Sequence, residues 1–146
     1  MEVIGSAEMG LVILDNNYIL RVWNLFMVQH SGLSAESVMG KNIFKLFPDI
    51  SSDWFIDKVQ QIQSRKTKLL STWEERPYLF KFVNNRRQFS SAAYMYQNIT
   101  LIPLASASGE IENFAITISD VTDIAASTQK LDAVVSEYSQ YTYKKN

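Results

Sequence analysis

The sequence predicts an α+β domain in which an antiparallel sheet of about five strands is covered on one face by short helices. Strand-like runs of branched apolar residues occur near both ends of the chain, and a block with helical spacing separates them. Strands grouped on either side of a helical block favour an α+β fold over an alternating α/β fold. The length of 146 residues fits one domain with a modest tail.

The first two strands are expected to form a hairpin. Residues 10–14 are an apolar run rich in branched side chains, and residues 18–23 return to the same composition. Between them, Asp15-Asn16-Asn17 is a turn signal. Two such runs around an Asp/Asn turn are typical of a β-hairpin.

Short helices are expected next. Residues 25–29 suit one or two helical turns that end near Ser31-Gly32. Ser34 is positioned to cap a helix over 35–39, and Asn42 to cap another over 43–46, because both side chains accept hydrogen bonds from free amides of a first turn.

A longer helix is predicted over residues 54–65, with Ser52 or Asp53 as its N-cap. Its apolar residues recur at spacings of three and four, which gives the helix one buried face. These residues are Phe55, Ile56, Val59 and Ile62.

The second half of the chain resembles strands. Residues 68–74, 78–83, 94–104 and 111–119 are candidates, and Pro77 interrupts the first two. The last two segments are expected to pair as a hairpin. The strand register in 66–93 is not predicted, because the pattern there is irregular.

A final helix is expected from residue 124 to the end of the chain, which divides it into a domain of residues 1–123 and a C-terminal signalling helix or linker of residues 124–146. The helix carries a narrow apolar stripe, which favours pairing with a second copy or continuation into a coiled coil. The stripe consists of Ile124, Leu131, Val134, Val135 and Tyr138.

Three stretches carry a more specific pattern. The first is Gly10-Leu-Val-Ile-Leu-Asp15, followed by a strand that ends in Trp23-Asn24. The second runs from Ser31-Gly32-Leu33-Ser34-Ala35-Glu36 to Leu46-Phe47-Pro48. The third closes the last strand with Asp120-Val121-Thr122-Asp123-Ile124. In order and spacing they resemble the PAS family of sensory domains, over roughly residues 8–126.

The resemblance implies a PAS-like fold and a non-catalytic sensory module from a bacterial multidomain signalling protein, in which a histidine kinase or a diguanylate cyclase is the output. It would bind a small ligand or a partner and relay the signal through its last strand and exit helix, in two-component or cyclic-di-GMP signalling. Asp120 and Thr122 stand at that transition and are the predicted relay residues. Both types also cap helices well, so a purely structural role is equally compatible with their position.

Short helices pack irregularly on a sheet, so an apolar cavity between the two layers is the expected ligand site. The alternative is that the same residues fill the core. The candidate lining residues are Trp23, Phe26, Met27, Phe44, Phe55, Val59, Phe80, Tyr96, Ile99 and Ile116.

The composition limits the cofactors. The chain contains no cysteine, so it cannot form the cysteinyl-flavin adduct or the cysteine-attached chromophore of light-sensing PAS domains. Heme is not expected either, because the helix over 54–65 lacks the histidine that the resemblance would require, and His30 is expected to be a surface or hydrogen-bonded core residue. A non-covalent flavin or a small metabolite remains open. No metal site and no catalytic constellation is predicted.

Partners are constrained by charge and hydropathy. Lys plus Arg number 14 and Asp plus Glu 15, without a basic stripe, so no nucleic-acid binding is expected, and Arg86-Arg87 is interpreted as a solvated turn. No apolar run approaches the about 18 residues of a membrane span. A cytoplasmic homodimer, paired through the termini or the exit helix, is the expected form. Two alternatives are a protein-interaction or dimerisation module with a filled core and a small cone-like α+β enzyme.

Overall fold

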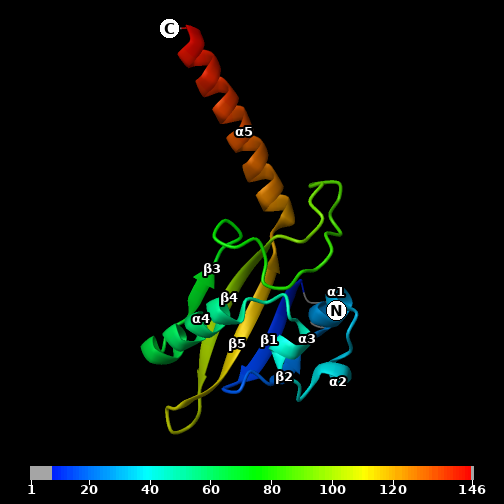
Figure 1. The fold of residues 1–146 in the computed structure, drawn as a ribbon, viewed down its shortest axis with the longest axis vertical. Coiled ribbons are helices and arrows are strands. Elements are labelled where there is room, and N and C mark those ends of the chain that lie inside the picture. The colour runs from blue at the N-terminus through cyan, green and yellow to red at the C-terminus, as the bar shows by residue number, and fades with distance from the viewer. Residues whose placement is uncertain (1–7, 146) are drawn as a thin grey trace, which may run out of the picture.

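The computed structural model describes residues 8–145. Its strands are β1 (Met9–Asp15), β2 (Leu20–Trp23), β3 (Leu69–Ser71), β4 (Gln97–Ala105) and β5 (Ile111–Asp120). Its helices are α1 (Leu25–Ser31), α2 (Ala35–Val38), α3 (Ile43–Leu46), α4 (Ser52–Arg65) and α5 (Thr122–Lys145). The strands form one antiparallel sheet in the order β2-β1-β5-β4-β3. Figure 1 shows α1 to α4 beside this sheet and α5 extending away from it. The predicted fold class is confirmed.

The β1–β2 hairpin forms as predicted, but its second strand starts later than residue 18. The Asp15 carboxylate accepts hydrogen bonds from the amides of Asn17 at 2.8 Å and Ile19 at 3.1 Å, which closes the turn. Tyr18 has a φ of 62°, in the left-handed region. A strand cannot include that conformation, so β2 begins only at Leu20.

Side-chain caps define the starts of the short helices. The side-chain oxygens of Asn24, Ser34 and Asn42 accept backbone amides at the starts of α1, α2 and α3. The caps predicted at Ser34 and Asn42 are therefore confirmed. The cap of α4 is Ser51, one residue before the predicted Ser52, because its hydroxyl reaches the amide of Trp54.

The main core lies between the helices and one face of the sheet. Alternate residues of β1, β4 and β5 are at most 3% exposed there, as expected from the two-residue period of a strand. From the other side, α4 contributes Phe55, Val59 and Ile62, which confirms its predicted buried face. The strand residues are Val12, Leu14, Ile99, Leu101, Phe114, Ile116 and Ile118.

The prediction was least accurate between α4 and β4. The strand expected over 68–74 is only β3, and the one expected over 94–104 begins at Gln97. The strand expected over 78–83 does not form, apart from one bridge between Val83 and Tyr94. The backbone of residues 79 and 80 is instead bonded to the side chain of Gln97. Gln97 Oε1 accepts from the amides of Leu79 and Phe80, and Gln97 Nε2 donates to the Phe80 carbonyl at 2.7 Å.

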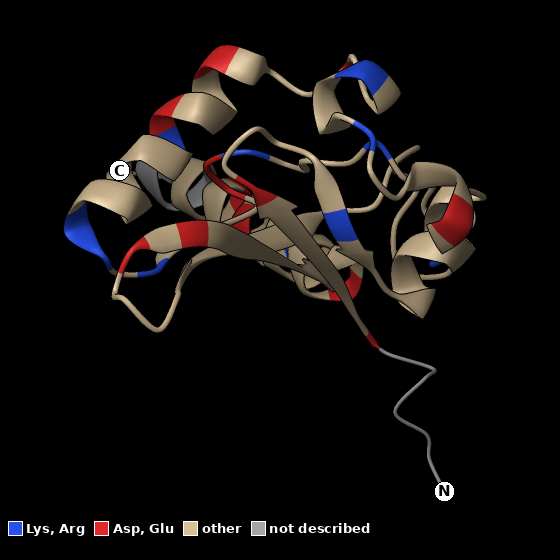
Figure 2. Ribbon diagram, turned by 90° about the horizontal axis from the view of Figure 1, so that it is seen from below, with Lys and Arg blue, Asp and Glu red and all other residues tan. Residues whose placement is uncertain are grey.

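The exit helix α5 starts at Thr122, two residues before the predicted residue 124. Its first intrahelical bond runs from the Ala125 amide to the Val121 carbonyl at 2.8 Å. None of the helices among residues 8–145 combines the length and the apolar character of a membrane span. Basic and acidic residues are interspersed over the helices and the sheet (Figure 2).

Candidate functional site

Nine of the ten predicted lining residues are brought together, but as a packed cluster, whereas Tyr96 lies apart and packs against Trp73. Eight of the ten are at most 4% exposed, and only Phe44 and Tyr96 are partly exposed. Phe44 lies edge-on to Phe55 with ring centroids 5.8 Å apart, and Trp23 lies edge-on to Phe80 at 6.0 Å. Such separations are those of directly packed aromatic pairs. The eight buried residues are Trp23, Phe26, Met27, Phe55, Val59, Phe80, Ile99 and Ile116.

Phe80 comes from the long connection between β3 and β4, which we call the 72–96 segment. It is 1% exposed and lies edge-on to Phe47 at 5.2 Å and stacked on Phe82 at 5.4 Å. The segment therefore inserts side chains between α1, α3 and the sheet. Of the ten predicted lining residues, Phe80 alone also borders one of the cavities described below.

One cavity, which we call the His30 pocket, lies beside this insertion and has a volume of about 290 Å³. Its walls come from the end of α1, the α3–α4 connection and the 72–96 segment, and combine apolar with polar surface. The lining residues are His30, Ser31, Leu46, Phe47, Pro48, Asp49, Ile50, Leu79, Phe80, Lys81, Phe82 and Val83.

His30 lies between two aromatic rings in this pocket. Its centroid is 4.3 Å from that of Phe26 and 5.9 Å from that of Phe82, to which it is nearly parallel. The Nδ1 atom is buried and has no hydrogen-bond partner among the described residues. His30 is thus half-exposed, as a surface residue would be, but its buried Nδ1 lacks the hydrogen bond expected of a core histidine. A buried polar atom without a partner costs about 1–3 kcal/mol, which marks the position as unusual.

Burial lowers the pKa of His30 below the ordinary value of 6.5; the negative charge of Asp120 opposes this shift and the positive charge of Arg86 adds to it. The unfolded chain therefore binds a proton that the folded chain rejects. We expect the free energy of unfolding to decrease as the pH falls through 6.5 and below. Urea titrations of the wild type and His30→Phe across this range test the expectation.

The phenylalanine variant keeps the aromatic stack and removes the titrating group. Its stability curve should be flatter than that of the wild type over this range, since carboxylates contribute equally to both proteins. Parallel curves for the two proteins would show that His30 does not titrate differently on folding.

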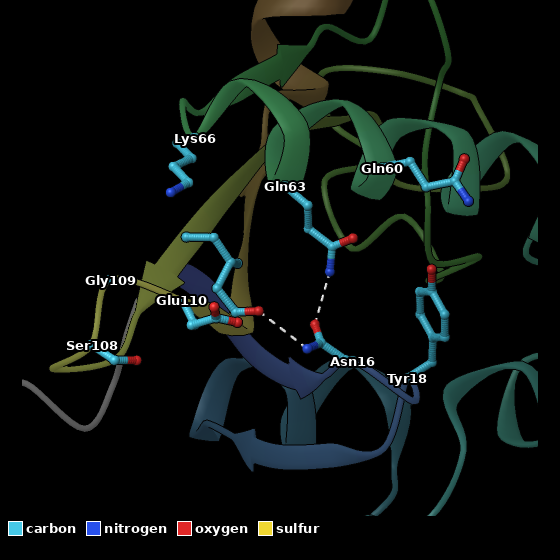
Figure 3. A pocket seen from close by; sticks show the side chains of 9 residues that line it. Asn16, Tyr18, Gln60, Gln63, Lys66, Ser108, Gly109 and Glu110 are labelled. Atoms are coloured by element: carbon cyan, nitrogen blue, oxygen red, sulfur yellow. Dashed lines mark hydrogen bonds between the residues drawn. The ribbon is translucent and has the colours of Figure 1, made fainter.

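A second, polar hollow of about 620 Å³ lies between the β1–β2 turn, α4 and the β4–β5 turn (Figure 3). Asn16 spans it, accepting from Gln63 Nε2 at 2.8 Å and donating to the Ile111 carbonyl at 3.1 Å. Tyr18 lines it, and burial raises the pKa of this phenol. The side-chain amides of Asn16 and Gln63 are bonded to each other, and Asn16 is also bonded to the Ile111 carbonyl. These bonds connect the β1–β2 turn with α4 and with the start of β5. The rest of the hollow is lined by Gln60, Lys66, Ser108, Gly109 and Glu110.

The predicted relay residues form the connection from β5 to α5, which we call the Asp120 junction. The Asp120 side chain is 8% exposed, and its Oδ1 accepts from the Thr122 amide at 3.0 Å and the Thr122 hydroxyl at 2.6 Å. The same Thr122 hydroxyl accepts from the Tyr96 amide at 3.1 Å. The Thr122 hydroxyl thus connects the start of α5 with the end of β5, through Asp120, and with the 72–96 segment, through Tyr96.

Arg86 adds a charged contact that the sequence did not reveal. Its Nε lies 3.2 Å from Asp120 Oδ2, and its Nη1 lies 3.4 Å from Asp123 Oδ2. Arg86 begins a turn and is 41% exposed, as predicted, but the prediction missed its ion pairs with Asp120 and Asp123. Asn84 positions it: this side chain is buried, accepts from the Arg86 amide at 2.7 Å and donates to the carbonyls of Ser90 and Ala92.

Three solved structures show what the chain is similar to. A sensory box sensor histidine kinase from Vibrio cholerae is 31% identical, with 77% of this chain and 82% of that one covered and a TM-score of 0.62. The PAS domain of a protein from Colwellia psychrerythraea is 12% identical, with 81% and 90% covered and a TM-score of 0.59. The PAS domain of the histidine kinase ThkA is 23% identical, with 77% and 98% covered and a TM-score of 0.52. No protein-family model and no curated protein matches the sequence.

An open antiparallel sheet with helices on one face and a C-terminal helix is the fold that this chain shares with the sensory box structure from Vibrio cholerae. The chain belongs to the PAS family, and it is a PAS domain of a signalling protein.

Proposed function

We propose that this PAS domain is a non-catalytic regulatory module that passes a change in the domain to an output domain through β5 and α5. The observation that carries the proposal is the Asp120 junction. Its carboxylate is almost fully shielded from water and is bonded to the first residue of α5 and to Arg86 of the 72–96 segment. A shift of that segment therefore changes the contacts that set the direction of α5.

The partner of α5 is proposed to be a second copy of the chain. Its large apolar residues Leu131, Val134, Val135 and Tyr138 are 54–70% exposed and stand on one side of the helix. Apolar positions at spacings of three, four and seven favour a paired helical seam. The downstream output is proposed to be a histidine kinase, as in the Vibrio cholerae and ThkA proteins, with a diguanylate cyclase as the alternative. The cysteine-free composition supports the proposed cytoplasmic location.

The tight packing of the aromatic cluster favours an input at the surface of the domain over a ligand bound in its centre. Because Phe80 fills the space between sheet and helices, the signal enters at the surface of the 72–96 segment, from a ligand or a protein partner. A large flavin in the centre of the domain would have to displace this cluster.

Thr122→Val tests the junction. Valine has the shape of threonine but cannot accept from the Tyr96 amide or donate to Asp120. We expect α5 to become loosely oriented relative to the sheet. The absence of native cysteine allows spin labels at introduced Lys45→Cys and Gln140→Cys, and double electron–electron resonance measures the distance between them. Dilution with unlabelled protein removes contributions between copies.

The variant should broaden the distance distribution relative to the parent. Thr128→Val, on the same helix beyond the junction, is the matched control and should leave the distribution unchanged. Equal distributions for the parent and Thr122→Val would overturn the proposal that the junction sets the direction of α5.

A further inference from the structure

We infer that the His30 pocket is a binding site for a small aromatic molecule with one hydroxyl group, and that its occupation is the input that reaches the Asp120 junction. The second part rests on the function proposed for that junction. The pocket lies at the outer side of the Phe80 insertion, between α1 and the 72–96 segment, and not within the packed cluster against the sheet.

The size and walls of the pocket set the ligand class. A volume of about 290 Å³ is at the lower end for small-molecule sites, which fits a molecule of one or two rings. Phe47, Phe80 and Phe82 line the pocket together with Ile50 and Leu79. Phe80 and Phe82 are stacked on each other and are 1% and 4% exposed, so the half-buried Phe47 offers the most accessible aromatic ring. Aromatic walls of this kind favour an aromatic ligand, which can stack on them or meet them edge-on.

His30 sets the polar group of the ligand. Its buried Nδ1 has no partner among residues 8–145, and Phe82 lies nearly parallel to the imidazole with ring centroids 5.9 Å apart. We expect a ligand that separates Phe82 from His30 to make this nitrogen accessible. A neutral imidazole has one donor and one acceptor nitrogen, and a hydroxyl group can pair with either. The charges at the rim, Lys81 and Asp49, are of opposite sign and favour neither an anion nor a cation.

Two routes connect Phe82 to the junction. Its carbonyl accepts from the Met95 amide at 2.8 Å, and the next residue, Tyr96, is bonded through its amide to the Thr122 hydroxyl. In the other direction the chain reaches Asn84 and Arg86 within four residues, and Arg86 is paired with Asp120. Displacement of Phe82 is therefore expected to move both Tyr96 and Arg86, the two residues of the 72–96 segment that contact the Asp120 junction.

The probe is para-cresol, with toluene as a matched molecule that lacks only the hydroxyl group. Two-dimensional amide spectra of the 146-residue protein are recorded during titration with each. We expect para-cresol to shift the amides of His30 and of residues 81–83, and also those of Asp120 and Thr122. One added hydrogen bond predicts about fivefold tighter binding of para-cresol than of toluene.

Two variants, with one control, distinguish the site itself from its hydrogen bond to the ligand. Val83→Trp fills the rim of the pocket from an exposed position and should abolish both titrations, whereas Leu70→Trp, exposed on β3, should not. His30→Phe should equalise the two affinities while toluene still binds. Binding that Val83→Trp leaves unchanged, or an absence of shifts at residues 81–83, would overturn the site.

Shifts that stay within the pocket and do not reach Asp120 and Thr122 would overturn only the coupling. The function proposed for the junction is tested separately, since the spin-label experiment on Thr122→Val needs no ligand.

Discussion

Replacing Asp120 with alanine is expected to lower the free energy of unfolding by about 2–3 kcal/mol. The carboxylate is 8% exposed and accepts two hydrogen bonds from Thr122 as well as the Arg86 contact, so alanine leaves the Thr122 amide, its hydroxyl and the guanidinium without their shared acceptor. This loss of stability is smaller than that for a fully buried ion pair, which is about 3–5 kcal/mol. The reason is that Arg86 is 41% exposed, so water can solvate its guanidinium.

Urea unfolding followed by circular dichroism measures the effect, and the chain supplies its own controls. Asp132→Ala removes an exposed carboxylate from α5 and should change stability by less than about 0.5 kcal/mol. Arg86→Ala should cost less than Asp120→Ala, because the Thr122 bonds remain. The double variant should be less destabilised than the sum of the two, as expected for residues in contact. Strict additivity would contradict a direct interaction between Arg86 and Asp120.

The fold was predictable where a local signal determined the structure. The apolar runs of the opening hairpin and of β5, and the cap residues Ser34 and Asn42, act over a few residues and therefore appear in the sequence. The helix start at the Asp120 junction was placed within two residues for the same reason. Short-range hydrogen bonds need no knowledge of the tertiary structure.

The 72–96 segment was not predictable, because it is held by contacts between residues distant in sequence. Apolar residues at 78–83 suggested a strand, yet the buried amide of Gln97 binds their backbone in place of a neighbouring strand. An internal glutamine carries no sequence signal for such a role. The pairing of Arg86 with Asp120 is similar, since 34 positions separate the two residues in the numbering of the chain.

The candidate site was predicted only in part. Asp120 and Thr122 were found because a family pattern marks the end of the last strand, and the structure shows the hydrogen bonds around them. The predicted lining residues were selected for being large and apolar, a criterion that does not distinguish cavity walls from a filled core. His30 was set aside as an isolated histidine, and only its position between Phe26 and Phe82 draws attention to it.

The stripe on α5 leads to the second large expected effect. Leu131, Val134 and Tyr138 are more than 60% exposed, although burial of such side chains is favourable by about 1.5–3 kcal/mol for each aliphatic residue. A parallel pair of α5 helices buries Leu131 from both copies, because a two-fold interface uses the same surface twice. In the proposed dimer, burial of the stripe would contribute several kilocalories per mole of stability.

Leu131→Asp should raise the dissociation constant of the dimer by at least about 100-fold, since it removes two buried leucines and brings two like charges together. Sedimentation velocity over a range of concentrations measures the change. Ser136→Asp adds the same charge on the opposite side of α5 and should leave the dimer intact, while circular dichroism verifies that both variants keep their helix. A wild-type protein that sediments as a monomer at every concentration would exclude α5 as a self-association surface.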